Sequence, residues 1–257
     1  MNRTMHQTHA ARLSDYGSPT PYAGLYGRIA VSPATTLRWL LLASLALLLC
    51  NLVVQVSHHV LGHPNLRGFA ATFDLNGEGN VPALFAALLL VTATVLLALI
   101  ASLTQQRGAP FSRHWQALAV IFAYLAVDEA AQLHEKIGFN VAQLIDTRGV
   151  PAFYVWVLPF GVLVALFGVI YLPFVRALAP RLRLIVIGSG SMYVGAALGL
   201  EVVDAAYTRV FGFANLTHAL IYSLEEVAEM WGIIFFIYGL LCFLREERAQ
   251  LEARFSA

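Results

Sequence analysis

Residues 81–103 read VPALFAALLLVTATVLLALIASL, a stretch without a single charged side chain. A helix needs about 20 predominantly apolar residues to cross the hydrocarbon core of a bilayer, and this stretch is long enough. Five further apolar stretches lie around it along the chain: 37–60, 114–137, 152–175, 183–207 and 217–243. Because the connections between them are short, the sequence predicts an all-α fold, a polytopic membrane bundle of six transmembrane helices.

The composition of the whole chain agrees with a membrane protein. Of 257 residues, 59% are hydrophobic and 12% are charged, and the mean hydropathy is +0.70. A soluble domain carries about 25% charged residues, so the composition excludes a disordered protein, a soluble nucleic-acid binder and an ordinary cytosolic enzyme. The two cysteines, Cys50 and Cys242, fall at different predicted membrane depths, and we expect no disulfide between them.

The distribution of Lys and Arg predicts the orientation in the membrane. Twelve of the 16 basic residues lie in the N-terminal segment, in two loops and at the C-terminus, and four lie on the opposite side. The basic side of a membrane protein faces the cytoplasm. We therefore expect both termini in the cytoplasm. The predicted parts are a flexible tail (1–36), the six-helix domain (37–244) and a short tail (245–257).

Eight acidic residues fall in the outer halves of three predicted helices: Asp128, Glu129 and Glu135 in 114–137, Glu201 and Asp204 in 183–207, and Glu225, Glu226 and Glu229 in 217–243. Each ionised carboxylate in a bilayer costs roughly 2.5–3.5 kcal/mol. Their charge is offset by metal cations, protonation, histidine partners or a water-filled cavity. Intramembrane acids are functional by default, so we expect a site here.

The spacing of polar residues favours convergence of the three helices. Tyr124, Asp128, Gln132 and Glu135 recur at helical intervals, and two similar stripes follow in 183–207 and 217–243. Gly195 and Gly199 form a small-residue pair that predicts close packing of the helix 183–207. The stretches 81–103 and 152–175 have no ionisable residue in their apolar cores, and we expect them to be scaffold helices that face lipid.

Carboxylates with a few histidines are typical ligands of iron, zinc or manganese. The predicted ligands of such a divalent metal ion are Asp128, Glu201, Glu225, Glu229, His218 and His134. Glu129, Asp204 and Glu226 are the predicted catalytic, proton-transferring residues, because burial and like charges raise carboxyl pKa values. The Glu-x-x-His repeat of soluble di-iron bundles is absent.

The outer loop 73–80 begins like an EF-hand loop, but position twelve is Phe85 rather than Glu. It is either a glycine-rich turn or a segment that brings Glu78 over the acidic site. His58 and His59 end the first helix at the same level, as ligands or as interfacial residues.

Three elements together resemble a family of uncharacterised bacterial multipass membrane proteins: the Gly77-Glu78-Gly79-Asn80 loop, the Asp128-Glu129-x4-His134-Glu135 motif and Glu225-Glu226…Glu229-Met230. The resemblance spans roughly 70–240 and implies that these acids share one site. It also implies that the protein lies in the cytoplasmic (inner) membrane of a bacterium. The arrangement is also loosely similar to alkaline-ceramidase-like membrane hydrolases, which hold zinc with histidines. Here carboxylates replace the paired C-terminal histidines of that group.

The preferred interpretation is a metal-dependent membrane hydrolase or oxidase that acts on a membrane lipid or small amphiphile from the outer leaflet. One alternative is a transporter coupled to protons or divalent cations. Another is a non-catalytic assembly subunit that only holds a metal ion. We expect no nucleic-acid partner.

Overall fold

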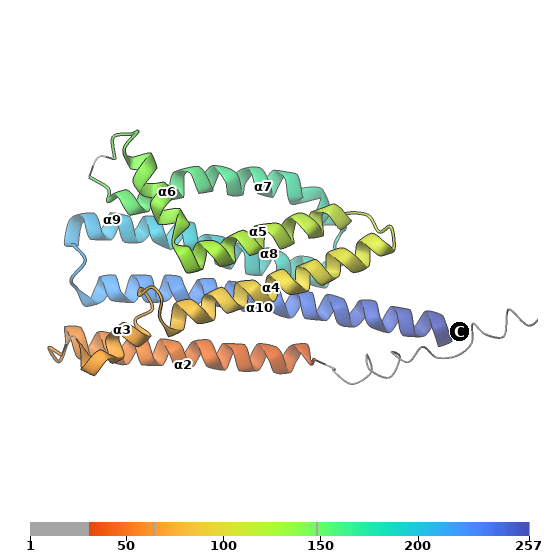
Figure 1. The fold of residues 1–257 in the computed structure, drawn as a ribbon, viewed down its shortest axis with the longest axis horizontal. Helices are drawn as coiled ribbons and strands as arrows, with labels where there is room; N and C mark the ends of the chain where they lie inside the picture. Colours follow the sequence, from red (N-terminus) through yellow and green to blue (C-terminus); the bar gives the residue numbers. More distant parts are fainter. Residues whose placement is uncertain (1–30, 64, 148, 257) are drawn as a thin grey trace, which may run out of the picture. The chain divides into compact units, whose positions relative to one another are not determined.

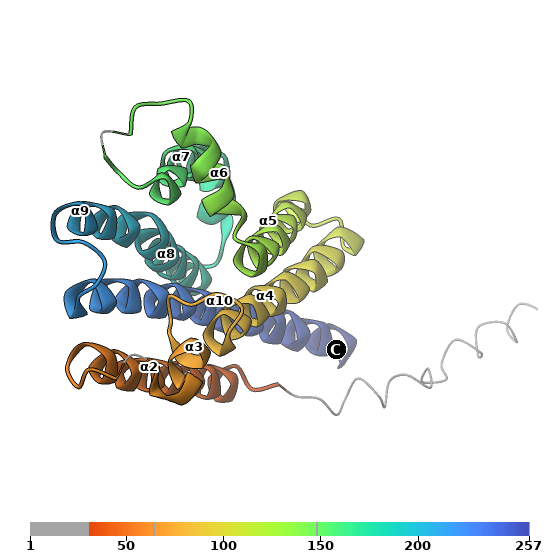
Figure 2. The same ribbon diagram turned by 60° about the vertical axis from the view of Figure 1, so that its left-hand side comes forward.

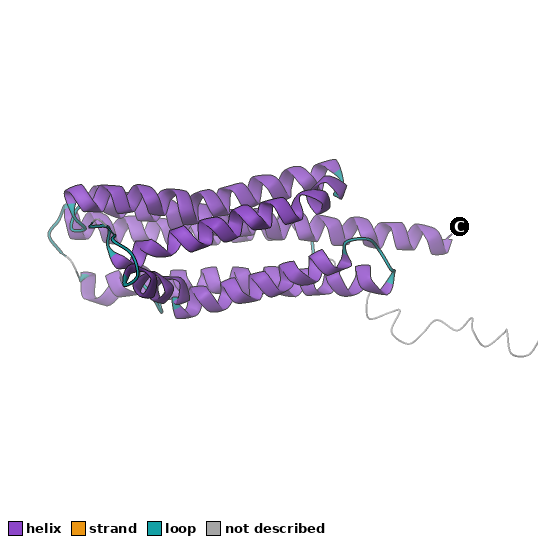
Figure 3. Ribbon diagram, turned by 90° about the horizontal axis from the view of Figure 1, so that it is seen from above, coloured by secondary structure: helices purple, strands orange, loops and turns teal. Residues whose placement is uncertain are grey.

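The computed structural model describes residues 31–63, 65–147 and 149–256. The expected tail 1–36 lies almost entirely outside the described residues. Within the described chain every regular element is helical and no strand occurs (Figure 3), which confirms the all-α class.

Among the described residues, five segments can cross a membrane by length and composition, and a sixth is added if one bent helix pair counts as a single span. In chain order the spans are α2 (Pro33–His59), α4 (Val81–Gln106), the bent pair α5 (Ser112–Ala131) and α6 (Leu133–Ala142), η3 (Ala152–Trp156) with α7 (Val157–Ala177), α8 (Pro180–Val194) with η4 (Gly195–Leu200) and α9 (Glu201–Phe211), and α10 (Leu216–Ser256). The short elements η2 (Leu66–Gly68) and α3 (Phe69–Phe73) connect α2 to α4.

The long helix α10 is the centre of the bundle: it contacts α2, α4, α8, η4 and α9 (Figures 1 and 2). Two glycines of α10 allow the closest approach. A Cβ on Gly232 would lie 2.9 Å from both Cβ and N of Tyr193, and one on Gly239 would lie 2.8 Å from Cγ2 of Ile185. These distances leave no room for a side chain, so the glycines set the α8–α10 separation.

The predicted packing role of Gly195 and Gly199 is wrong. A Cβ at either position would meet nothing within 4 Å. The small residues at the interface are on the partner helix instead, at Gly232 and Gly239, seven residues apart and thus on one face of α10.

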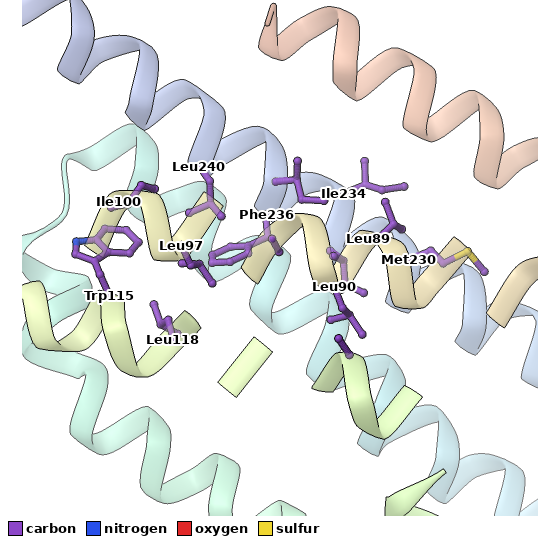
Figure 4. Packing of buried hydrophobic residues seen from close by; sticks show 14 of the residues in the cluster. Leu89, Leu90, Leu97, Ile100, Trp115, Leu118, Met230, Ile234, Phe236 and Leu240 are labelled. Carbon is purple, nitrogen blue, oxygen red and sulfur yellow. The ribbon is translucent and has the colours of Figure 1, made fainter. Parts of the chain in front are cut away.

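A hydrophobic cluster from α4, α5 and α10 fills the middle of the bundle (Figure 4). Leu97, Ile100, Ile234 and Leu240 in this cluster are completely buried. The expectation that 81–103 is merely a lipid-facing scaffold is therefore wrong, because one face of α4 forms the core. The second expected scaffold, 152–175, agrees better with the structure, since only Tyr171 and Phe174 of α7 are buried.

The predicted continuous helix 114–137 is interrupted at Gln132, whose φ of 52° is left-handed. The two parts, α5 and α6, meet at an angle of 78°. The Gln132 amide still donates to the carbonyl of Asp128 (2.7 Å), and Lys136 Nζ donates to the carbonyl of Ala131 (2.7 Å). Both bonds satisfy carbonyls that the end of a helix leaves without a partner.

A second irregularity lies in the span 180–211, where η4 is a π-helix immediately before Glu201. A π segment changes the angular register of the residues that follow it and is frequent at functional sites. The simple i, i+4 spacing from Tyr193 to Glu201 therefore does not hold through this segment.

Candidate functional site

An acidic cavity of about 270 Å³ lies at the end of the bundle where α10 begins. Its wall comes from the 75–78 loop, α5, α6, η3, α7, the α8–η4–α9 span and α10. No lysine or arginine occurs among the described residues that line it. We call this space the acidic cavity.

The structure places all nine predicted ligands and catalytic residues around this one cavity: Asp128, Glu129, His134, Glu201, Asp204, His218, Glu225, Glu226 and Glu229. Two further acids, Glu78 and Glu135, also line it. His58, His59 and Tyr124 are not among its lining residues. Tyr124 lies one turn before Asp128 in α5 and close to it, but it does not reach the cavity.

The break between α5 and α6 brings Asp128 and His134 together. Oδ1 of Asp128 accepts a hydrogen bond from the amide of His134 (2.8 Å), and Oδ2 lies 3.0 Å from Nδ1 of the His134 ring. In a continuous helix, residues six apart do not share a face. Nδ1 faces the carboxylate, so Nε2 is the ring nitrogen that can bind a ligand.

Glu201 lies at the centre of the carboxyl groups. Its Oε1 accepts a hydrogen bond from Nε1 of Trp156 (2.9 Å), and its carboxyl group lies close to that of Glu225. Glu201 also lies near His134 and Glu229, so four titratable side chains converge here.

Asp204 forms a separate group with Tyr154 and His218. Its Oδ2 accepts a 2.6 Å hydrogen bond from the Tyr154 hydroxyl and lies 3.2 Å from Nε2 of His218. His218 Nδ1 lies 2.8 Å from the carbonyl oxygen of Phe213, so that nitrogen carries a proton. Oδ1 of Asp204 is buried and has no hydrogen-bond partner among the described residues.

The remaining glutamates of the cavity lie close to one another. Glu129, Glu226 and Glu229 all line the cavity and lie close enough to influence one another's charge. Glu78 is at the rim, outside the membrane spans. Desolvation raises the pKa of Glu78 above its ordinary value, and the nearby Glu135 carboxylate adds to this, while a hydrogen bond with Gln132 opposes it.

The residues described by the structure contain no group of three or more His, Cys, Asp or Glu side chains already arranged to hold a metal ion. The donor types around the cavity, carboxylate and imidazole, are nevertheless those that divalent transition metals use. The predicted ligands thus line one cavity, but their side chains are not in the positions that a metal ion would need.

A family described as a domain of unknown function, DUF8692, matches residues 39–243. The chain belongs to the DUF8692 family. No curated protein and no solved structure matches the chain. The family match agrees with the expected uncharacterised family and carries no information on the resemblance to alkaline ceramidases.

The 73–80 loop of this DUF8692 protein is a turn that also brings Glu78 to the cavity. Asn80 caps α4 by accepting from the amide of Ala83 (3.1 Å), and its Nδ2 donates to the carbonyl of Asp74 (2.7 Å). A Cβ on Gly77 would lie 2.6 Å from that same Nδ2. The Gly77-Glu78-Gly79-Asn80 motif is therefore a helix cap that requires glycine.

A buried polar network ties this loop to the DUF8692 bundle. Asn51 Nδ2 donates to Oγ of Ser223 (2.7 Å), and its Oδ1 accepts from the amide of Leu75 (3.1 Å). Oδ1 of Asp74 accepts from both Gln55 Nε2 (3.2 Å) and the Tyr222 hydroxyl (3.1 Å). The network fixes α2, the loop and α10 beside the cavity.

The sequence interpretation missed Tyr154 and Trp156 as site residues. The side chain of Trp156 is buried and hydrogen-bonded to Glu201. The sequence did contain an indication: residues 154–156 lie at the end of their predicted span that has the same membrane depth as the acids. Aromatic side chains with a polar hydrogen usually find a partner when buried.

Proposed function

We propose that this DUF8692 protein is a membrane-embedded enzyme that binds a divalent metal ion in the acidic cavity and acts on a lipid or small amphiphile. The observation that carries the proposal is the composition of the cavity wall. Nine carboxyl groups and two imidazoles line it, and no lysine or arginine does among the described residues. A bound cation would offset the cost of these charges in a membrane.

The electrostatic neighbours of Glu201 favour a particular ligand set. Glu201 is the common neighbour of His134, Glu225 and Glu229, which makes these four side chains the proposed ligands. The three glutamates would close around the ion by rotation of their side chains. Asp128 would act through His134, because a carboxylate on the second ring nitrogen orients a metal-binding histidine.

His218 is left out of this set for a geometric reason. One ring nitrogen faces the carbonyl of Phe213 and the other faces Asp204, so binding a metal would break one of the two contacts.

A bound divalent metal supplies Lewis acidity to a reacting oxygen. The protein's own contribution is proton transfer and the exclusion of water. Glu129 and Glu226 lie beside the proposed ligands and are the groups that would hold or release a proton. Phe160, Val164 and Leu198 form an apolar part of the same wall, where a hydrocarbon chain would lie.

The hydrophobic cluster weighs against the transporter alternative. On α4, α5 and α10, buried apolar residues separate the acidic cavity from a second cavity of about 420 Å³ at the other end. The described residues therefore provide no chain of titratable groups between the two cavities.

Elemental analysis of the purified protein tests the proposal. We expect near-stoichiometric iron, zinc or manganese in the wild type. Glu225→Ala should lose most of the metal, and Asp128→Ala should bind it roughly 10–100-fold more weakly. Glu246→Ala, on the same helix beside the opposite cavity, is the matched control and should keep the metal. Chelation should lower the melting temperature, since a ligand of the folded state stabilises it.

Two results together would overturn the proposal: folded wild-type protein takes up none of these metals, and chelators do not change its melting temperature.

A further inference from the structure

One buried acceptor in the acidic cavity is not used by the protein itself. Asp204 is 4% exposed and lines the cavity, and its Oδ1 has no hydrogen-bond partner among the described residues. Its other oxygen, Oδ2, already faces Tyr154 and His218. Leaving a buried carboxylate oxygen without a donor is costly, so a donor supplied from the cavity would bind favourably.

We infer that Asp204 Oδ1 accepts a hydrogen bond from the ammonium group of an amine-bearing amphiphile. This inference deepens the proposed function, since it rests on that cavity being the substrate site and names the class of substrate.

The charge of the wall selects the head group. Nine carboxyl groups without a described lysine or arginine beside them repel phosphate, sulfate and carboxylate head groups, and they attract a cation. The aromatic rings of Trp156, Phe213 and Tyr222 also line the cavity. Ring faces favour an organic cation.

The hydrogen bond adds a further selection among cations. A primary ammonium has N–H donors for Oδ1, whereas a quaternary ammonium has none. A site that recognises only the positive charge would bind both kinds of ammonium with similar affinity. A difference in affinity between them therefore reports on the hydrogen bond to Asp204.

The size and wall of the cavity indicate how the rest of the ligand is placed. A volume of about 270 Å³ is just below the usual range of about 300–1,000 Å³ for pockets that enclose a drug-sized ligand. It therefore accommodates a head group and the first carbons of a chain. The apolar side chains of Val164 and Leu198 line the same space and would contact those carbons.

The test measures binding of four probes to the full-length protein in lipid nanodiscs by calorimetry, with empty nanodiscs subtracted. The probes are octylammonium, octyltrimethylammonium, octanol and octyl phosphate. We expect octylammonium to bind roughly tenfold or more tightly than octyltrimethylammonium, and the other two to bind least. A fifth probe, ethylammonium, distinguishes the source: weaker binding than octylammonium indicates an amphiphile, and equal binding indicates a soluble amine.

Two matched variants separate the hydrogen bond from general charge. Asp204→Ala and Glu226→Ala each remove one carboxyl from the same cavity, and alanine leaves no acceptor in its place. Asp204→Ala should abolish the preference for octylammonium over octyltrimethylammonium, and Glu226→Ala should weaken both probes alike and keep the preference. Tyr154→Phe removes the donor to Oδ2 but retains the Asp204 carboxylate, so it should still prefer octylammonium even if Asp204→Ala fails to fold.

Equal binding of the two cations by the wild type, or loss of the preference in Glu226→Ala as well as in Asp204→Ala, would overturn the inference. Metal analysis of the same samples distinguishes the two proposals. Metal without amine binding overturns this inference alone, whereas amine binding in metal-free protein supports it and overturns the metal-dependent function.

Discussion

The carboxylate of Asp128 holds His134 through both of its oxygens, one on the backbone amide and one on the ring. This double contact explains why a left-handed residue is tolerated between them. The left-handed conformation costs a non-glycine residue roughly 1–2 kcal/mol. Hydrogen bonds to a charged group contribute roughly 1.5–3 kcal/mol each, which is enough to offset it. The bend of the chain and the position of the imidazole thus have the same cause.

The first prediction concerns Gln132, whose φ is 52°. Glycine adopts this conformation without a steric penalty, so Gln132→Gly should keep the stability of the wild type or raise it by up to about 1 kcal/mol. A β-branched residue is strained there, and Gln132→Val should lower stability by roughly 1–2 kcal/mol. Both variants remove the same amide side chain. Thermal unfolding compares them, and equal stability of the two variants would contradict the left-handed break.

The second prediction concerns the contact between α8 and α10. A Cβ on Gly232 would lie 3.0 Å or less from backbone atoms of Tyr193 and Ser189, which cannot rotate away. Gly232→Ala should therefore destabilise the protein by roughly 1–3 kcal/mol. Gly195→Ala is the matched control, because a Cβ there meets nothing within 4 Å and should be tolerated. Chemical denaturation of both variants checks the difference.

The third prediction is a dependence on pH. The pKa of Glu78 is raised above the ordinary value of 4.5, mainly by desolvation. The folded state therefore holds this proton more tightly than the unfolded state, and Glu78 loses stabilising effect as the pH rises from the ordinary to the raised value. Glu78→Gln has no such loss, so its melting temperature relative to wild type should increase as the pH rises above 4.5. A difference that is constant or decreases with pH would contradict this.

The fourth prediction is the orientation in the membrane. The excess of Arg on one side predicts a cytoplasmic C-terminus. The acidic cavity lies at the other end of α10 from that terminus, so it should open to the outside. A cytoplasmic reporter should be active when fused after residue 257, and an external reporter should be active in the loop 143–150. The reverse pattern would place the cavity on the cytoplasmic side.

Much of the fold follows from local apolarity and could be predicted from the sequence. Stretches such as 81–103 have no stable alternative to a membrane span, and acids on otherwise apolar helices indicate a shared interior. The sequence predicted the ends of the helices only approximately. For example, α10 continues to Ser256, beyond the predicted end at 243.

The irregular parts of the site could not be predicted from spacing. Left-handed Gln132 depends on Asp128 reaching the amide of His134, a contact that exists only after the helix breaks. The π segment before Glu201 likewise changes the register of the residues that follow, and the apolar sequence of 195–200 does not indicate it. Trp156 and Tyr154 were missed because a residue near a helix end has the same sequence pattern whether it faces lipid headgroups or a neighbouring carboxylate.

The hydrophobic cluster between the two cavities has a consequence for bioenergetics. Leu97, Ile100 and Ile237 are fully buried in it. Most of the transmembrane voltage would fall across such a low-dielectric layer, and work against it is about 2.3 kcal/mol per charge per 100 mV. A proton consumed or released in the cavity would return to the side it came from. Turnover of the proposed enzyme would thus be electroneutral and should proceed equally in energised and in uncoupled membranes.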